Sequence, residues 1–265
     1  MQRVTSKQNP RLRETAALIA SARERRKSGK CVLEGEHLIA VYAARGGEPE
    51  TLIVTDEAII GPEVRRLAER MGQRALIVSA SLLGALAALP AGIGMLAVVA
   101  TPQPVVRDPG DFCLLLDDVQ DPGNVGSILR SAAAAGVDQV LLSGHCAFAW
   151  SPKVLRAGQG AHFCVDIHEG VDLVAWAADY RREGGEVIAA VVSGGTNLYA
   201  APLAKRLALA VGNEGAGLSS SLLAEATQRV TIPMPGRFES LNAAAAAAVL
   251  LFECARRRGE VNAIA

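Results

Sequence analysis

Apolar and polar positions alternate in blocks along the chain, and these blocks predict strands and helices in turn. In the first hundred residues, short apolar runs typical of strands occur at residues 31–35, 52–54, 75–78 and 94–100. Helical patterns lie at residues 10–28, 36–44, 62–71 and 79–89, the last capped by Ser79 or Ser81. Strands that alternate with helices predict a small α/β domain with a parallel or mixed sheet.

The second part of the chain repeats this alternation on a larger scale. Apolar runs typical of strands occur at residues 112–116, 139–142, 163–167, 187–192, 207–211 and 230–232. Helical patterns occur at residues 126–135, 151–156, 173–183, 219–226 and 242–258. Because the run at 112–116 is apolar throughout, it is typical of a parallel strand that is buried on both faces. The pattern predicts an α/β layer sandwich with six strands.

A proline-rich stretch separates these two parts. Residues 101–110 contain Pro102, Pro104 and Pro109 and have no hydrophobic periodicity, which is typical of a linker. We therefore expect one domain at residues 1–104 and a second at residues 105–265.

The composition limits the class of protein. Half of the residues are apolar but only 4% are aromatic, so we expect a core built from Ala, Val, Leu and Ile. No apolar run approaches the roughly 20 residues that a membrane-spanning helix requires. Residues 1–6 lack the apolar segment of a signal peptide, and we expect a cytoplasmic protein.

The cysteines and histidines do not predict a metal site. Five cysteines without a C-x-x-C pair indicate reduced thiols rather than a disulfide framework or a zinc site. Four alternating residues could share one face of a strand, as metal ligands do: His162, Cys164, Asp166 and His168. Because alternating polar positions are more often the exposed face of an ordinary strand, we expect no metal.

Positive charge is concentrated near the start of a chain whose net charge is zero. Residues 1–30 contain two acidic residues, Glu14 and Glu24, against nine basic ones: Arg3, Lys7, Arg11, Arg13, Arg23, Arg25, Arg26, Lys27 and Lys30. Such a cluster indicates a surface that contacts phosphate groups. The alternative is a solvated helix face.

Three segments carry the candidate chemistry, and each follows a predicted strand. The first runs from Asp117 to Arg130, the second from Leu207 to Leu218, and the third from Val230 to Asn242. In the third segment two prolines end the strand, and Ser240 or Asn242 can cap the alanine-rich helix that follows. Strand, loop and helix in this order bring backbone donors and acceptors to the edge of a sheet where α/β proteins bind ligands. The simpler alternative is a well-capped helix after a proline turn.

The glycines of these segments exclude two common phosphate-binding motifs. Gly212, Gly215 and Gly217 do not have the order of a G-x-G-x-x-G fingerprint, and the chain contains no Walker sequence.

In this order, the three segments resemble the signature motifs of the SpoU/TrmH family of RNA 2′-O-ribose methyltransferases. The segments at residues 6–10 and 32–35 resemble that family's N-terminal substrate-binding domain. The resemblance implies a C-terminal trefoil-knotted α/β layer sandwich of the SPOUT class and a smaller N-terminal α/β domain similar to ribosomal protein L30. It also implies S-adenosylmethionine as cofactor, RNA as partner and a homodimer through the alanine-rich helix, although small residues suit an internal helix equally well.

The resemblance assigns roles to ten residues of the three segments. It implies catalytic roles for Arg130, Asn124, Glu214, Ser240 and Asn242. It implies contacts with the cofactor for Gly212, Gly215, Ile232, Met234 and Leu241. Without it, Arg130 is an ordinary surface arginine and Glu214 an acid favoured at a helix N-terminus. A guanidinium holds its proton too tightly to act readily as a base, so we expect Arg130 to orient the ribose hydroxyl and stabilise the alkoxide.

The sequence also predicts the RNA contacts and the substrate. We expect RNA contacts from Arg3, Lys7, Arg11, Arg25, Arg26 and Arg156. Residues 151–161 resemble a family segment that usually has a serine where Gly158 stands, so this chain lacks a side-chain hydroxyl at that position. The N-terminal domain resembles that of rRNA-directed members, which favours 23S-type rRNA. The alternatives are a tRNA 2′-O-methyltransferase and a catalytically silent RNA-binding or ribosome-assembly factor, which the intact motif residues disfavour.

Overall fold

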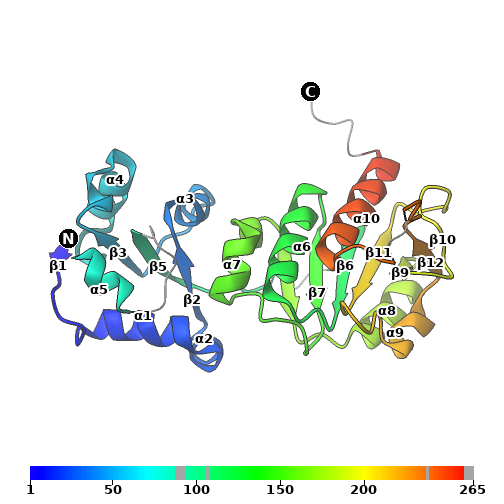
Figure 1. Cartoon of the computed structure of the whole chain (residues 1–265), viewed down its shortest axis with the longest axis horizontal. Coiled ribbons are helices and arrows are strands. Elements are labelled where there is room, and N and C mark those ends of the chain that lie inside the picture. Colours follow the sequence, from blue (N-terminus) through cyan, green and yellow to red (C-terminus); the bar gives the residue numbers. More distant parts are fainter. Residues whose placement is uncertain (87–93, 105–107, 237–238, 260–265) are drawn as a thin grey trace. The chain divides into compact units, whose positions relative to one another are not determined.

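The chain forms two compact units. The computed structural model describes residues 1–86, 94–104, 108–236 and 239–259, and Figure 1 shows the course of the chain. The first unit contains Met1–Pro102 together with Trp150–Phe163, and the second contains Gln103–Ala149 together with Cys164–Ala265. The chain therefore passes from one unit to the other three times. The first passage lies between Pro102 and Gln103, two residues before the expected boundary after residue 104.

The first unit is built on a mixed sheet with the strand order β1-β4-β3-β5-β2. Its strands are β1 (Gln2–Arg3), β2 (Lys30–Glu34), β3 (Thr51–Thr55), β4 (Ala75–Val78) and β5 (Met95–Ala100). The described helices are α1 (Pro10–Ala20), α2 (Ala22–Ser28), α3 (Glu36–Ala44), α4 (Pro62–Met71), α5 (Ala80–Gly84) and α7 (Pro152–Gly158). Short 3₁₀ turns occur at η1 (Ala58–Ile60), η2 (Gly72–Arg74) and η3 (Ala161–Phe163). Strand β5 is antiparallel to β2 and β3, whereas β1, β3 and β4 are parallel.

One predicted helix of this unit is broken. The pattern predicts a single helix over residues 10–28, but Ser21 has extended backbone angles and separates α1 from α2. Its hydroxyl accepts a hydrogen bond from Glu24 N at 3.2 Å. Serine competes with helical hydrogen bonding in this way, which makes it a better N-cap than a helix-interior residue. The predicted bounds of α3 and α4 are confirmed.

The second unit is built on a parallel sheet with the strand order β10-β12-β9-β11-β6-β7-β8. Its strands are β6 (Phe112–Asp117), β7 (Gln139–Leu142), β8 (Asp166–Glu169), β9 (Glu186–Ala190), β10 (Thr196–Asn197), β11 (Leu207–Gly212) and β12 (Gln228–Thr231). The described helices are α6 (Pro122–Ala134), α8 (Leu173–Arg182), α9 (Ser220–Glu225) and α10 (Ala243–Arg258). The predicted strands overlap six of these, and the pattern missed β10, a two-residue edge strand that only its pairing with β12 defines.

Two local predictions in this unit need correction. Residues 163–167 are not one strand, because η3 ends at Phe163 and β8 begins only at Asp166. The alternating residues from His162 to His168 therefore do not share one strand face. Among the residues that the structure describes, no group of three or more His, Cys, Asp or Glu side chains could hold a metal ion. Helix α6 begins one turn earlier than expected, because Asp121 Oδ1 caps it by accepting from Asn124 N at 2.8 Å.

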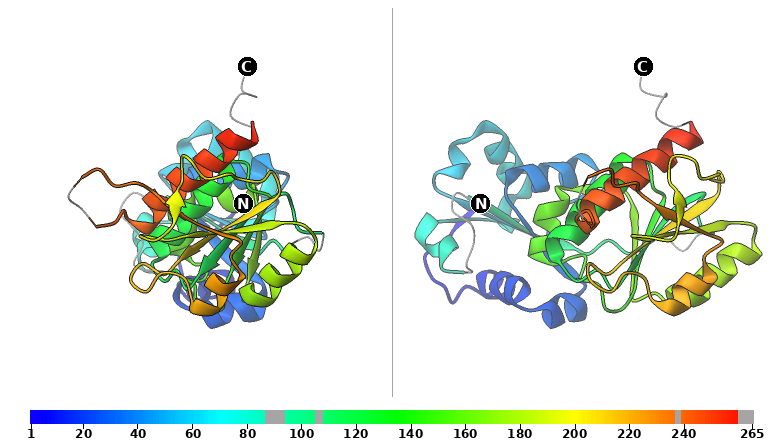
Figure 2. Two further views of the ribbon diagram at one scale, coloured as in Figure 1. Left: turned by 90° about the vertical axis from the view of Figure 1, so that its right-hand side faces the viewer. Right: turned by 45° about the vertical axis from the view of Figure 1, so that its right-hand side comes forward.

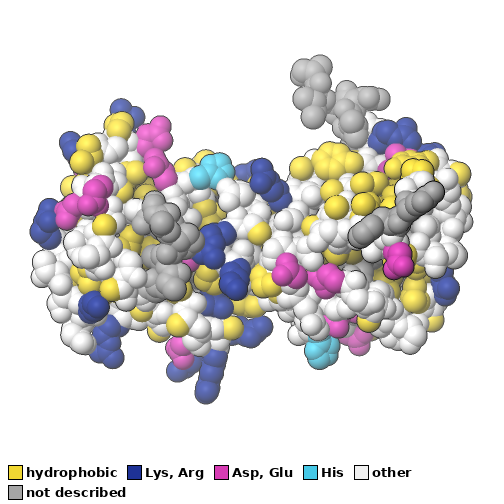
Figure 3. Space-filling view, in the orientation of Figure 1, with side chains coloured by type: hydrophobic (Ala, Val, Ile, Leu, Met, Phe, Trp, Pro, Cys, Tyr) yellow, Lys and Arg dark blue, Asp and Glu magenta, His cyan; other side chains and the backbone are white. Residues whose placement is uncertain are grey.

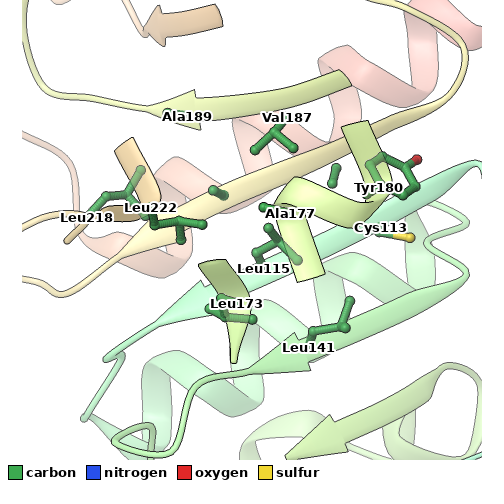
Figure 4. Packing of buried hydrophobic residues seen from close by; sticks show 12 residues of the cluster. Cys113, Leu115, Leu141, Leu173, Ala177, Tyr180, Val187, Ala189, Leu218 and Leu222 are labelled. Carbon is green, nitrogen blue, oxygen red and sulfur yellow. The ribbon is translucent and has the colours of Figure 1, made fainter. Parts of the chain in front are cut away.

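Helices cover both faces of the parallel sheet. On one face, α8 packs Leu173, Ala177 and Tyr180 against apolar residues of β6, β7, β9 and β11 (Figure 4). These three residues are spaced as i, i+4 and i+7, so they lie on one side of the helix. Helices α6 and α10 pack against each other on the opposite face (Figure 2). In the described part of the chain, no helix is long and apolar enough to cross a membrane.

Candidate active site

The three candidate segments begin at one edge of the parallel sheet. Strands β6 and β11 are neighbours, and Gly212 at the end of β11 pairs with Asp117 at the end of β6. The first and second segments therefore leave the sheet side by side. The third segment follows β12 and leads to α10, which returns to pack on α6. Parallel strands thus collect residues far apart in sequence at their carboxyl ends.

A pocket of about 270 Å³ lies at this edge. Its lining comes from the ends of β9, β11 and β12, from the loop after β11, and from the first half of α10. All the residues to which the resemblance assigns cofactor contacts line it: Gly212, Gly215, Ile232, Met234 and Leu241. Ser240 and Glu214 line it as well. Two other residues of the third segment, Arg237 and Phe238, lie outside the described residues.

The loop after β11 presents its backbone to this pocket. A Cβ atom on Gly212 would lie 2.3 Å from the carbonyl carbon of Gly217, so a side chain cannot fit there. Asn213 and Gly217 exchange backbone hydrogen bonds of 2.9 and 3.0 Å, which close the loop. Asn213 Oδ1 also accepts hydrogen bonds from Gly215 N and Ala216 N, both at 2.9 Å. This tight loop lets a ligand approach the backbone closely.

Side chains from all three segments form one hydrogen-bonded chain beside the pocket. Asn124 Nδ2 donates to Glu214 Oε1 at 2.9 Å. Asn124 Oδ1 accepts from Asn242 Nδ2 at 3.0 Å. Asn242 Oδ1 in turn caps α10 by accepting from Ala244 N at 2.9 Å. The Asn124 amide therefore donates through its nitrogen and accepts through its oxygen. It holds the Glu214 carboxylate on one side and the start of α10 on the other.

Glu214 is held in its ionised form. Partial burial favours the neutral carboxyl, but hydrogen bonds from the Asn124 side chain and from nearby backbone N–H groups outweigh it. The pKa of Glu214 therefore lies below its ordinary value. A fixed negative charge at the pocket attracts a cationic ligand or a hydroxyl donor.

Among the residues that the structure describes, Arg130 has no such partner. Its side chain is exposed on α6, and within the described ranges it forms no ion pair. It lies six positions after Asn124, so the two side chains leave the helix about 120° apart. The structure therefore does not join Arg130 to the hydrogen-bonded chain, and its guanidinium remains available to a ligand from outside.

Two further hydrogen bonds between the first and second segments involve residues that the sequence did not single out. Asp117 Oδ2 accepts from Ser219 N at 2.8 Å, and Asn213 Nδ2 donates to Asp118 O at 2.8 Å. Asp118 has a φ of 58°, which is uncommon for a residue with a side chain, and its N–H donates to Ser143 Oγ at 2.9 Å. These bonds lock the first loop to the second. The position of Asp117 directly after a buried strand is the signal that could have identified it.

Three residues predicted to contact RNA lie on the surface of the first unit. Lys7, Arg26 and Arg3 are exposed, and Figure 3 shows Lys and Arg side chains over α2. Arg3 also pairs with Asp56 at 2.7 Å. Exposed ion pairs of this kind contribute little to stability, so Arg3 can exchange its partner for a phosphate.

Two more of these residues have partners within the first unit. Arg11 Nη1 donates to the carbonyl of Gln73 at 2.7 Å. Arg156, on α7, forms an ion pair with Glu34 at the end of β2.

Arg25 is an exception among the basic residues. Only 6% of it is exposed, and its Nη1 donates to Leu18 O and to Ile19 O, the latter at 3.1 Å. Burial lowers the pKa of Arg25. A cation at a helix C-terminus satisfies carbonyls that lack helical partners, so Arg25 stabilises the end of α1. The prediction that it contacts RNA is therefore revised.

The fold and the pocket define a class: an α/β protein that binds a small organic molecule at the carboxyl edge of a parallel sheet. Glu214 adds an ionised carboxylate to the pocket lining, and Arg130 adds an exposed positive charge on α6. The chain belongs to the SpoU rRNA Methylase family, whose sequence model matches residues 111–252. A second model, that of the MRM3-like substrate binding domain, matches residues 9–97.

Individual relatives resemble the chain over nearly its whole length. The 23S rRNA (guanosine(2553)-2′-O)-methyltransferase RlmP of Bacillus subtilis is 31% identical over 252 residues, which cover 95% of this chain and 98% of the relative. The AdoMet-bound rRNA methyltransferase from Sinorhizobium meliloti is 28% identical, with a TM-score of 0.82 and coverage of 97% and 98%. AviRb from Streptomyces viridochromogenes in complex with AdoMet is 28% identical, with a TM-score of 0.82 and coverage of 95% and 98%.

Proposed function

We propose that this chain is an S-adenosylmethionine-dependent enzyme that methylates the 2′-hydroxyl of a ribose in 23S-type rRNA. The observation that carries the proposal is the hydrogen-bonded chain of Asn124, Glu214 and Asn242 beside the pocket. A silent binding factor has no need of an ionised carboxylate held in this way. Membership of the SpoU rRNA Methylase family and the likeness to AdoMet-bound structures support both the activity and the cofactor.

The residues of the pocket suit S-adenosylmethionine. The backbone at Gly212 leaves room that a side chain would fill, and Ile232, Met234 and Leu241 provide apolar contacts. When bound, the cofactor supplies an activated methyl group. The protein then has to orient the ribose hydroxyl and stabilise the charge that develops on it. We assign the second task to Arg130, and we assign to Asn124 the holding of Glu214 in position.

The first unit is proposed to bind the RNA. Its match to a substrate binding domain supports this role, as do the exposed side chains of Lys7, Arg26 and Arg3. Each phosphate that they neutralise makes RNA binding more sensitive to salt. We propose that the enzyme works in the cytoplasm.

The substrate is tested by mapping 2′-O-methyl groups in total RNA from cells with and without the gene. We expect one mark to disappear from 23S-type rRNA and to return when the wild-type gene is restored. A gene that encodes the Arg130→Ala variant should not restore it. A mark lost only from tRNA would overturn the rRNA assignment, and marks that all persist would favour the silent factor.

The proposal includes the trefoil knot that the family resemblance implies. It is supported by the course of the third segment, which leaves β12 on the far side of β9 and returns to α6. An experimental structure whose backbone reduces to an unknotted line when its ends are pulled would contradict this part.

We also propose that the chain is a homodimer through α10. The outer side of this helix carries Ala245, Val249 and Phe252, and Phe252 is 46% exposed. Their spacing of four and three residues forms one stripe, and hydrophobic side chains gather over α10 in Figure 3. An apolar stripe of this kind is typical of an interface.

Light scattering at micromolar concentration should give the mass of a dimer, and Phe252→Glu should shift it toward the mass of a monomer. A charge at the interface has to be desolvated when the dimer forms, which weakens association. A monomeric mass for the wild type would contradict the homodimer.

A further inference from the structure

Residues 150–163 belong to the methyltransferase domain by sequence but to the first unit by structure. The SpoU rRNA Methylase match runs through them, yet they form one compact unit with Met1–Pro102. Helix α7, which lies in this segment, packs against β2. We call residues 150–163 the docking segment.

The docking segment is fitted closely to the first unit. Gly160 has a φ of 93°, and a Cβ atom there would lie 2.7 Å from Val41 Cγ1 on α3. The rings of Phe163 and Tyr42 lie with their centroids 5.0 Å apart. A glycine that is required for two reasons and a packed aromatic pair indicate a specific contact rather than an incidental one.

An ion pair anchors the centre of this contact. Arg156 Nη1 on α7 pairs with Glu34 Oε2, and the Glu34 side chain is only 2% exposed. Burial raises the pKa of Glu34, and the charge of Arg156 opposes that rise. A buried carboxylate is stable in its ionised form only beside such a partner.

The two members of the pair have different surroundings. The Arg156 side chain remains 35% exposed, and a guanidinium has five N–H donors in a rigid planar fork. Glu34 therefore engages Nη1, one of the three guanidinium nitrogens, and the fork has further N–H donors for a second partner. An arginine fixed on one side in this way binds a phosphate at a smaller loss of side-chain entropy than a free one does.

We propose that Glu34 is a positioning residue that orients the exposed edge of Arg156 toward an RNA phosphate. The docking segment then links RNA held by the first unit to the methyltransferase domain, because the chain enters that domain at both ends of the segment. The inference rests on the proposed function. It assigns to Glu34 an effect on RNA binding, with none on cofactor binding.

The test uses the Glu34→Gln variant of the full chain with in-vitro-transcribed 23S rRNA. Gln keeps the shape of the side chain but removes the charge that orients Arg156. We expect the KM for this RNA to rise about tenfold, as for loss of a charged hydrogen bond, with kcat and S-adenosylmethionine affinity within about twofold of wild type. Glu36→Gln is the matched control, because Glu36 is exposed on α3, and its KM should not change.

The Arg156→Lys variant tests the same inference independently. Lysine keeps the positive charge but lacks the planar fork, so we expect a similar rise in KM without the loss of a buried countercharge. The KM of the double variant should be no higher than that of the more affected single variant, since both changes remove the same pairing of Glu34 with the Arg156 guanidinium. RNA affinity from filter binding should follow KM in each case.

Several outcomes overturn the inference. An unchanged KM in Glu34→Gln does so, as does a double variant in which the two effects add. A fall in kcat alone would move Glu34 into the chemical step. If Glu34→Gln melts below the assay temperature, Arg156→Lys and filter binding decide the question. Failure of the proposed function is distinct, because the wild type would then methylate no rRNA at all.

Discussion

Replacement of Arg130 by alanine should lower the rate of methyl transfer by about 100- to 1000-fold. Arg130 is exposed on α6 at the end of the first segment, and we propose that its charge stabilises the alkoxide that forms on the ribose. A positive group placed where charge develops acts mainly on the transition state, so its loss lowers kcat. Because Arg130 does not line the pocket, S-adenosylmethionine affinity should stay within about twofold of the wild-type value.

Single-turnover methyl transfer and calorimetry measure these two effects separately. Arg229→Ala is the matched control, because Arg229 is an exposed arginine of the same unit on β12, and its activity should be near wild type. Arg130→Lys should keep part of the rate, since the charge remains but the planar fork is lost. If cofactor affinity falls as far as turnover in Arg130→Ala, the role assigned to Arg130 is wrong.

Gly212→Ala should weaken S-adenosylmethionine binding by about 100-fold or more. The added methyl group would lie 2.3 Å from the carbonyl carbon and 2.4 Å from the carbonyl oxygen of Gly217. These are backbone atoms of a closed loop, so the whole loop has to move, and a shift of this size is costly in a packed site. Because Gly212 lines the pocket, the cofactor loses its contact with the displaced backbone.

Gly215→Ala is the matched control for this substitution. A Cβ atom on Gly215 meets only Asn213 Oδ1, at 3.6 Å, which is an ordinary contact. Its cofactor affinity should therefore be within a few fold of wild type, although Gly215 also lines the pocket. Calorimetry measures both affinities, and thermal melting shows whether either variant is folded. Equal losses in the two variants would mean that the close approach at Gly212 is not what the cofactor requires.

A truncation at residue 104 would divide the first unit, because that unit includes Trp150–Phe163. A fragment of residues 105–265 retains the docking segment but lacks the body against which α7, Gly160 and Phe163 pack. Such a fragment would lose the contact of α7 with β2, and α7 carries Val154 and Leu155, which are buried in the full chain. Loss of RNA binding in that fragment would therefore not separate the role of the first unit from simple misfolding.

Local signals determined most of the secondary structure. Gly61 and Pro62 start α4, Ser79 caps α5 and Asn242 caps α10, and each of these starts is visible in a few consecutive residues. The sequence also determined the three segments of the site, because their residues are contiguous and each follows an apolar run. The family resemblance needed no more than these residues and their order.

Only the tertiary structure decided which of these residues meet. Asn124 contacts Glu214 and Asn242 because β6 and β11 are neighbours and α10 returns to α6, and no local pattern encodes that return. Strands β1 and β10 exist only through their pairing with β4 and β12. Arg25 and Arg26 are adjacent and chemically identical, yet one is buried and the other exposed. Short-range propensity acts through the backbone of a few neighbouring residues, whereas burial and pairing depend on segments that are distant along the chain.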